Sequence, residues 1–208
     1  MSLMPKTRRR FVLLAAMALS GCAPLLPGGT APRLFVLSPR TEFTSPLPSA
    51  DWRLAIAQPY APAEIDSARI ALRRGPFAID YFADAAWPDR APTMMQSLLL
   101  ESFEETGRLP SVTREQQGLT ADILLLTELQ RFDAAYDQAS GNPTVVVRIL
   151  AQLASLPGHT IFAETRTEHR EPVPRNDIDA IVAGFDRAQG AAMADIVAWA
   201  LKNGGKRS

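Results

Sequence analysis

The chain has 208 residues, 47% of them hydrophobic, and its 22 basic and 22 acidic side chains give a formal net charge of zero. This balance provides no basic surface of the kind that nucleic-acid-binding proteins carry, so we expect no nucleic acid partner. The single cysteine excludes an intramolecular disulfide, and a hydrophobic core must therefore hold the fold together. Because the sequence shows no internal repeat, one domain is the expectation for this length.

Residues 1–21 have the three parts of a secretory signal peptide. A basic stretch (KTRRR) precedes nine apolar residues (FVLLAAMAL), and Ser20 and Gly21 are the small residues that a cleavage site requires. The apolar run is too short to cross a bilayer as a permanent helix. Cleavage before Cys22 would remove four basic residues and no acidic one, which leaves 18 against 22 and a net charge of −4. The mature chain is therefore predicted to be mildly acidic.

The sequence Leu-Ser-Gly-Cys that ends at Cys22 resembles the bacterial lipobox, which directs cleavage between Gly21 and Cys22. In that pathway the sulfur receives a diacylglycerol and the new amine receives a further acyl chain. A single acyl chain holds a protein only marginally, whereas two or more give a stable membrane anchor. Because Ala23 follows instead of Asp, the sorting rule of enterobacteria favours the outer membrane. We expect no cofactor apart from these covalent acyl chains.

The export route has two interpretations. The stretch TRRRFVL resembles the twin-arginine motif, which would export a folded domain, but ordinary Sec export of an unfolded chain also needs these charges and is preferred. Residues 22–32 hold the cysteine and a Pro/Gly-rich, uncharged tether that reaches about 35 Å when fully extended. The folded domain is predicted for residues 33–203, followed by a polar tail at 204–208.

Strands are predicted at residues 33–37, 52–57, 69–73, 77–82 and 121–132. A Gly75-Pro76 turn joins the third and the fourth. A helix is predicted to begin at the prolines of residues 88–92 and to end at Gly107. Its apolar positions recur at helical spacing, at Met95, Leu98, Leu99, Phe103 and Thr106.

A hairpin is predicted within residues 144–169, because both of its strands alternate between apolar and polar positions. A turn loop with an odd number of residues pairs Ile149 with Thr167 and Arg148 with Glu168. A two-residue loop would instead mix the two faces, since a slip by one residue inverts every side chain. We therefore predict an odd loop.

The last predicted element is a long amphipathic helix through Leu201, with Asn176 or Asp177 as its N-cap. Gly184 and Gly190 inside it each cost about 1 kcal/mol relative to alanine, and we expect them where the helix packs closely on the sheet. Strand-rich blocks that each end in an amphipathic helix predict the α+β class. The expected fold is a single domain with a largely antiparallel β-sheet and two amphipathic helices packed on one face.

The sequence provides no catalytic constellation. His159 and His169 lack further ligands at metal-site spacing and are predicted to be surface residues, and neither a G-x-S-x-G elbow nor a glycine-rich phosphate loop is present. We therefore predict that the protein is not an enzyme and binds no metal. Tyr81, Phe82 and Trp87 are candidates for an aromatic binding ledge, although filling of the core at the strand-to-helix junction is the preferred interpretation of this group.

The mature chain resembles the auxiliary lipoproteins of ABC-type MCE (mammalian cell entry) lipid transporters, including the lipoprotein of the paraquat-inducible system. The resemblance rests on the order of several blocks, among them "RLFVLSP", "ADILLLTELQRFDAAYD" and "IVAWALK". Ile79, Tyr81 and Trp87-Pro88 match a strand-to-helix element of the family. Ser67-Ala68 departs from it, because relatives often carry Arg-Pro there, which puts a contact at that place in doubt.

The resemblance implies a non-catalytic docking subunit of a phospholipid transport system, located on the periplasmic face of the outer membrane. Its partners would be an MCE-domain protein with the associated permease and ATPase, and relatives imply a ring-shaped homo-oligomer. A lipoprotein regulator or scaffold of cell-wall synthesis is the alternative. That role predicts a tether long enough to pass through the peptidoglycan, and ten residues after Cys22 argue against it.

Overall fold

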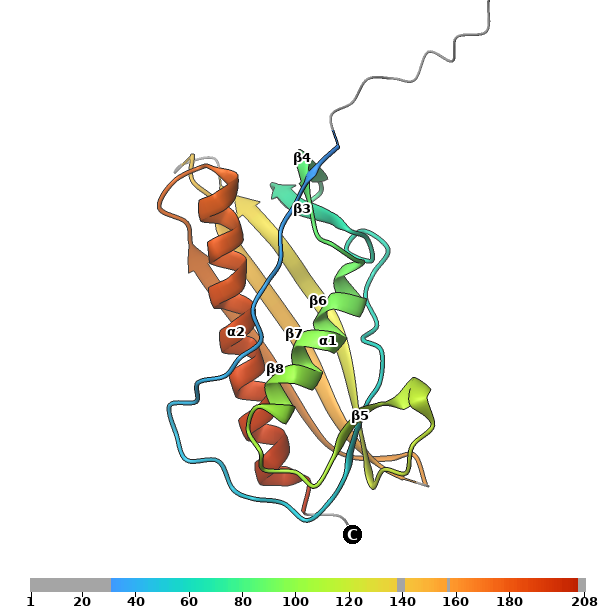
Figure 1. Cartoon of the computed structure of the whole chain (residues 1–208). Helices are drawn as coiled ribbons and strands as arrows, with labels where there is room; N and C mark the ends of the chain where they lie inside the picture. The colour runs from blue at the N-terminus through green and yellow to red at the C-terminus, as the bar shows by residue number, and fades with distance from the viewer. Residues whose placement is uncertain (1–30, 138–140, 157, 206–208) are drawn as a thin grey trace, which may run out of the picture. The chain divides into compact units, whose positions relative to one another are not determined.

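The computed structural model describes residues 31–137, 141–156 and 158–205 (Figure 1). The predicted signal peptide, the cleavage site at Gly21 and the lipidated Cys22 lie outside these residues, as does most of the tether. The elements are β1 (Arg33–Leu34), β2 (Leu54–Ile56), β3 (Arg69–Arg74), β4 (Ile79–Ala86), α1 (Ala91–Glu104), β5 (Val112–Arg114), a 3-10 turn (Glu115–Gln117), β6 (Ile123–Tyr136), β7 (Thr144–Ser155), β8 (Thr160–Pro172) and α2 (Ile178–Asn203).

The eight strands form one mixed sheet that is organised around β6. Along its whole length β6 pairs antiparallel with β7, which pairs antiparallel with β8. On its other edge β6 has two parallel neighbours, β2 at its start and β3 at its end. Most residue pairs belong to the antiparallel ladders, because the parallel ladders, which also join β1 to β4 and β2 to β5, are short. The predicted α+β domain with a largely antiparallel sheet is confirmed, although the short parallel strands were not anticipated.

Both helices lie on the same side of the sheet (Figure 1). Helix α2 lies along β7 and β8, and α1 lies beside α2 and contacts β2 and β5. Three aromatic rings meet under the helices, where Trp87 lies with its ring centroid 5.5 Å from that of Phe132 and 5.3 Å from that of Phe185. This face of the sheet therefore carries the hydrophobic core.

The first half departs from the prediction mainly in strand limits. The segment at 33–37 forms only two strand residues, although the amide of Phe35 still donates to the carbonyl of Ala86. The fourth strand begins at Ile79, later than expected, because residues 75–78 form the turn, with Gly75 at a φ of +81°. Helix α1 keeps the expected buried face, and Gly107 follows it at a φ of +57°.

The β7–β8 hairpin has the predicted register but not the predicted loop. Arg148 pairs with Glu168 as expected. Ser155, however, pairs with Thr160, so that four residues lie between them. A bulge that leaves Phe162 without a partner residue shifts the register by one and restores the inward alternation. The expectation of an odd loop was therefore wrong, because the bulge supplies the extra residue.

The two glycines of α2 differ from each other. Of the two predicted N-cap candidates, it is Asp177 that caps the helix, by accepting a hydrogen bond of 2.8 Å from the amide of Ala180. A Cβ at Gly184 would lie 3.1 Å from both Val145 and Val173, so this glycine does allow close packing on the sheet. A Cβ at Gly190 would meet nothing within 4 Å, and the same expectation was wrong there.

Candidate functional site

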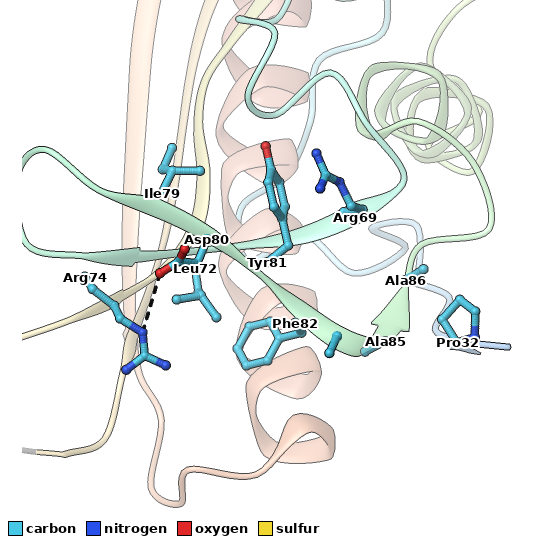
Figure 2. A pocket seen from close by; sticks show the side chains of 11 residues that line it. Pro32, Arg69, Leu72, Arg74, Ile79, Asp80, Tyr81, Phe82, Ala85 and Ala86 are labelled. Carbon is cyan, nitrogen blue, oxygen red and sulfur yellow. Dashed lines mark ion pairs between the residues drawn. The ribbon is translucent and has the colours of Figure 1, made fainter. Parts of the chain in front are cut away.

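The three residues of the predicted aromatic ledge do not share one surface. Trp87 is only 1% exposed and belongs to the core cluster described above, so it takes no part in a ledge. Tyr81 and Phe82 are half-buried neighbours on β4, and their side chains point to opposite sides of the strand (Figure 2). What the structure brings together around them is a hollow of about 750 Å³ along the β3–β4 hairpin.

The hollow originates in an irregular stretch of the hairpin. Arg69 pairs with Ala86 and Ala71 pairs with Tyr81, so β4 uses three more residues than β3 between these pairs. The extra residues bow away from β3. Pro32, at the start of the described chain, contributes to the lining, as does Arg74 near the turn (Figure 2). The hollow therefore extends from the entry of the chain towards the hairpin turn.

Arg69 and Tyr81 form the ordered polar part of this hollow. The Arg69 guanidinium lies 3.6 Å from the centroid of the Tyr81 ring, a cation–π stack. The Tyr81 hydroxyl donates a hydrogen bond of 2.9 Å to the carbonyl oxygen of Glu64, which fixes the ring. A stacked guanidinium keeps its N–H groups available at its edge for a planar acceptor such as a carboxylate or phosphate. The pair can bind an anion but lacks a nucleophile.

A row of charged residues lies on the sheet face opposite the helices. The register shows this, because Val145 faces Gly184 of α2 and the next residue, Val146, pairs with Asp133 and must face the other way. The row crosses four adjacent strands, β3, β6, β7 and β8. Its members are Arg73, Arg131, Asp133, Arg148, Glu168 and Arg170. We call these six residues the arginine row.

Two carboxylates hold four arginines in this row. Asp133 is 2% exposed and lies 2.6 Å from Arg131 and 3.8 Å from Arg73. The hydrogen bond to Asp133 raises the pKa of Arg131, and the hydrogen bond from Arg148 is the largest cause of the lowered pKa of Glu168. Arg131 and Arg148 are cross-strand neighbours of like charge, and each is held by its own carboxylate. The row has an excess of two positive charges, which suits contact with an acidic partner.

Beside the arginine row the same face carries a mixed polar and apolar surface. A hollow of about 270 Å³ is lined by Tyr60, Leu126 and Leu150 together with polar neighbours. Beyond it, Ala55, Leu124 and Ala154 form a small buried cluster. This sequence of charged, aromatic and apolar surface is typical of contact areas between proteins.

The histidines lie apart from these surfaces. His159 is exposed in the β7–β8 turn, with a φ of +49°. The Nε2 atom of His169 lies 2.8 Å from a carboxylate oxygen of Asp195, which also accepts from the Thr167 hydroxyl. No group of three or more potential His, Cys, Asp or Glu ligands occurs within residues 31–137, 141–156 and 158–205. None of the helices in these ranges has the length and apolar character needed to cross a bilayer.

An α+β domain with a charged open sheet face and shallow hollows has the features of a binding or assembly domain. Residues 35–197 match the family of ABC-type transport auxiliary lipoprotein components, and the chain belongs to this family. The family consists of auxiliary components of transport and is not a known family of catalysts.

Solved structures support the fold. The chain is similar to protein XCC0632 from Xanthomonas campestris, with 25% identity and a TM-score of 0.78 over 84% of this chain and 97% of that one. A second, uncharacterized protein shares the fold at 14% identity, with a TM-score of 0.61 over 81% of this chain and 97% of that one.

One curated relative is similar in sequence, the uncharacterized protein bll6063 of Bradyrhizobium diazoefficiens. It is 28% identical over 120 residues, which are 58% of this chain. The match covers about a third of the relative's own length (32%).

Sequence reasoning found only part of the arginine row. Alternation in β7 and β8 was enough to predict that Arg148 pairs with Glu168. Asp133 was missed because its burial depends on Arg73, which β3 brings alongside through a parallel pairing with no local signal.

Proposed function

We propose that this protein is a non-catalytic auxiliary subunit of an ABC-type MCE system that moves phospholipid between membranes. The family match over residues 35–197 is the observation that carries the proposal, because it covers nearly the whole described domain. The MCE assignment adds the resemblance of the sequence blocks to it. The chain would act as an adaptor that docks an MCE-domain protein, while a separate permease and ATPase drive transport.

The proposed location is the periplasmic face of the outer membrane. The lipobox sequence supports an anchor at Cys22, to which a diacylglycerol and an N-acyl chain would be attached, and Ala23 supports the outer membrane. Mass spectrometry of the native product tests this part alone. An N-terminus at Cys22 with the mass of its acyl chains is expected, and an unmodified thiol would remove the anchor from the proposal.

The open face of the sheet is the proposed contact surface for the acidic part of a partner, either the MCE protein or a neighbouring subunit of a ring. The excess of two arginines over carboxylates and the adjacent hollow of mixed polar and apolar lining favour such contacts. Because Arg170 lies on this face with its side chain 57% exposed, its charge can be reversed without touching the core.

The docking experiment is native crosslinking followed by purification of the full-length protein from its own host. An MCE-domain protein is expected among the crosslinked products. Arg170→Glu removes the positive excess of the arginine row, and because the Arg170 side chain is 57% exposed we expect it to reduce this crosslink with little change in stability. The matched variant Arg187→Glu, at an exposed arginine of α2 that also pairs with a carboxylate of β8, would not be expected to alter the crosslink.

Absence of any MCE-domain protein from the crosslinked products would contradict the transport role. Recovery of peptidoglycan synthases instead would favour the alternative role in cell-wall synthesis. The short tether argues against that role, because residues 23–32 reach only about 35 Å at full extension.

A further inference from the structure

The turn between β3 and β4 presents an apolar tip to solvent. Pro76, Phe77 and Ala78 are all exposed, and the Phe77 side chain is 99% exposed. A single exposed apolar residue is ordinary on a protein surface. Here three lie in succession at the point of a hairpin, and Phe77 has no contact that would explain its type. We call residues Pro76, Phe77 and Ala78 the tip.

The topology places this tip on the side from which the described chain approaches the sheet, eight residues along β4 and its turn from the pairing of Arg33 with Ala85. Strand β1 runs parallel to β4, with Arg33 opposite Ala85, so the chain that precedes Arg33 approaches from the side on which β4 starts. That side is the hairpin turn. Pro32 and Arg74 line the same hollow, and Figure 1 shows β3 and β4 at the end where β1 begins.

The length of the tether limits how far the tip can be from an anchor. Ten residues separate Cys22 from Pro32, so the domain's entry point lies within about 36 Å of the lipidated sulfur at full extension, and closer on average. The opposite end of the sheet lies a whole strand away from the tip. Residues Ile123–Tyr136 of β6 span about 45 Å between the two ends. The tip is therefore, together with the exposed Leu34 and Val36 at the entry itself, one of the apolar features that an anchored domain can bring to its bilayer.

The charges beside the tip suit the headgroup region. The Arg74 side chain is 65% exposed, lies over the ring of Tyr136 at 5.4 Å, and approaches Asp80 at only 3.7 Å. An exposed pair of this kind contributes little, so the guanidinium can exchange Asp80 for a phosphate oxygen, which it binds in a bidentate manner. Aromatic side chains with a neighbouring arginine are favoured at membrane interfaces.

We propose that the β3–β4 turn inserts Phe77 into the headgroup region of the phospholipid membrane that carries the anchor, with Arg74 bound to a lipid phosphate. This inference rests on the proposed lipidation of Cys22. The insertion adds a second, weaker attachment point to the acyl chains. With two attachment points, the tilt of the domain on the membrane would be more restricted than with the acyl chains alone.

The test uses the mature lipidated protein in vesicles of phosphatidylcholine with a quarter of phosphatidylglycerol, some of it brominated. Phe77→Trp places an indole at the tip, and Leu119→Trp is the matched control, because Leu119 is 60% exposed and lies just before β6 at the other end of the sheet. The parent chain gives the background, since Trp52 and Trp87 are buried and the partly buried Trp199 is present in every variant. We expect bromolipid to quench the Phe77→Trp chain alone.

A second measurement separates this inference from the anchor. A chain that begins at residue 22 and carries Cys22→Ser keeps every core residue, and its weak partition into the same vesicles reports the tip by itself. Phe77→Ser should lower that partition about tenfold, as expected for an exposed phenylalanine that no longer buries its ring. Leu119→Ser should leave it unchanged.

Each result supports or overturns the inference. Equal quenching at both positions, or none at Phe77→Trp, would overturn it even when mass spectrometry shows the acyl chains. A change in oligomer size with Phe77→Ser, without any change in vesicle binding, would show that the tip contacts a protein and would equally overturn it. If mass spectrometry shows no acyl chains on the native protein but the Cys22→Ser chain still binds vesicles through Phe77, the proposed anchor is refuted and membrane binding by the tip is supported.

Discussion

The two faces of the sheet differ in how they use the same strands. The face under the helices is apolar and closely packed, with Trp87, Phe132 and Phe185 in contact and Gly184 against Val145. The opposite face carries the arginine row and shallow hollows, and in the described residues neither helix covers it. We therefore expect the packing that stabilises the domain to be concentrated on the face under the helices. The other face can then carry contacts with partners at a small cost in stability.

The largest loss of stability is expected when an aromatic ring is removed from the core. Phe185→Ala should lower the free energy of unfolding by about 3–5 kcal/mol, because the ring is fully buried between Trp87 and Phe132. Urea denaturation followed by circular dichroism measures the loss. Leu150→Ala on the open face is the control, and an equal loss there would contradict the division between the faces.

Removing the buried carboxylate of the arginine row should have a smaller effect. Asp133→Asn keeps the shape of the side chain but leaves Arg131 and Arg73 with an excess of charge, and we expect a loss of about 1–3 kcal/mol. The loss is limited because both arginines reach solvent. Restoration of stability by Arg131→Gln in the same chain would identify the unpaired charge as the cause, whereas an additive loss would point to packing.

The two glycines of α2 test how closely different parts of one helix pack on the sheet. Gly184→Ala should destabilise the protein by about 1–3 kcal/mol, because its Cβ would lie 3.1 Å from two valine methyl groups. Gly190→Ala should instead stabilise it by up to about 1 kcal/mol, since nothing lies within 4 Å of the added Cβ. Thermal unfolding of the two variants should shift the melting temperature in opposite directions. A shift in the same direction would refute the packing argument.

The smallest effect concerns acid stability. The hydrogen bond from Arg148 holds the pKa of Glu168 below its usual value of 4.5. A lowered folded-state pKa means that the pairing stabilises the protein above about pH 4.5 and that this contribution is lost as the pH falls through the folded pKa. Glu168→Gln should therefore be less stable than the parent at neutral pH and should approach it in acid. A difference that does not change with pH would exclude this role of Glu168.

Local patterns predicted those parts of the fold that depend on neighbours in sequence. The alternation of residues 144–169 was enough to pair Arg148 with Glu168, and an N-cap at Asn176 or Asp177 followed from their side chains. Both features depend on contacts within one hairpin or one helical turn. The lipobox at Cys22 remains a prediction, because it lies outside the described residues.

Features that depend on distant segments could not be predicted. Val112–Arg114 becomes strand β5 only because β2 lies beside it in parallel, and nothing in its own three residues requires this. Trp87 was expected to fill the core at the strand-to-helix junction and is buried, but its contact with Phe185, nearly a hundred residues later, could not be predicted. Phe77 continues an alternating pattern, but Gly75 at a positive φ places the turn there and directs it to solvent.

The shared position of β6 has a consequence for the order of folding. Strands β2 and β3 are made first, yet their hydrogen-bonding partner is complete only at Tyr136. Local hairpins form faster than distant parallel pairings, so we expect β6, β7 and β8 to assemble first and to collect the earlier strands afterwards. Pulse-labelled hydrogen exchange should show protected amides in β7 before it shows them in β2 and β3. The reverse order would mean that β2 and β3 become structured before the β6–β7–β8 sheet has formed.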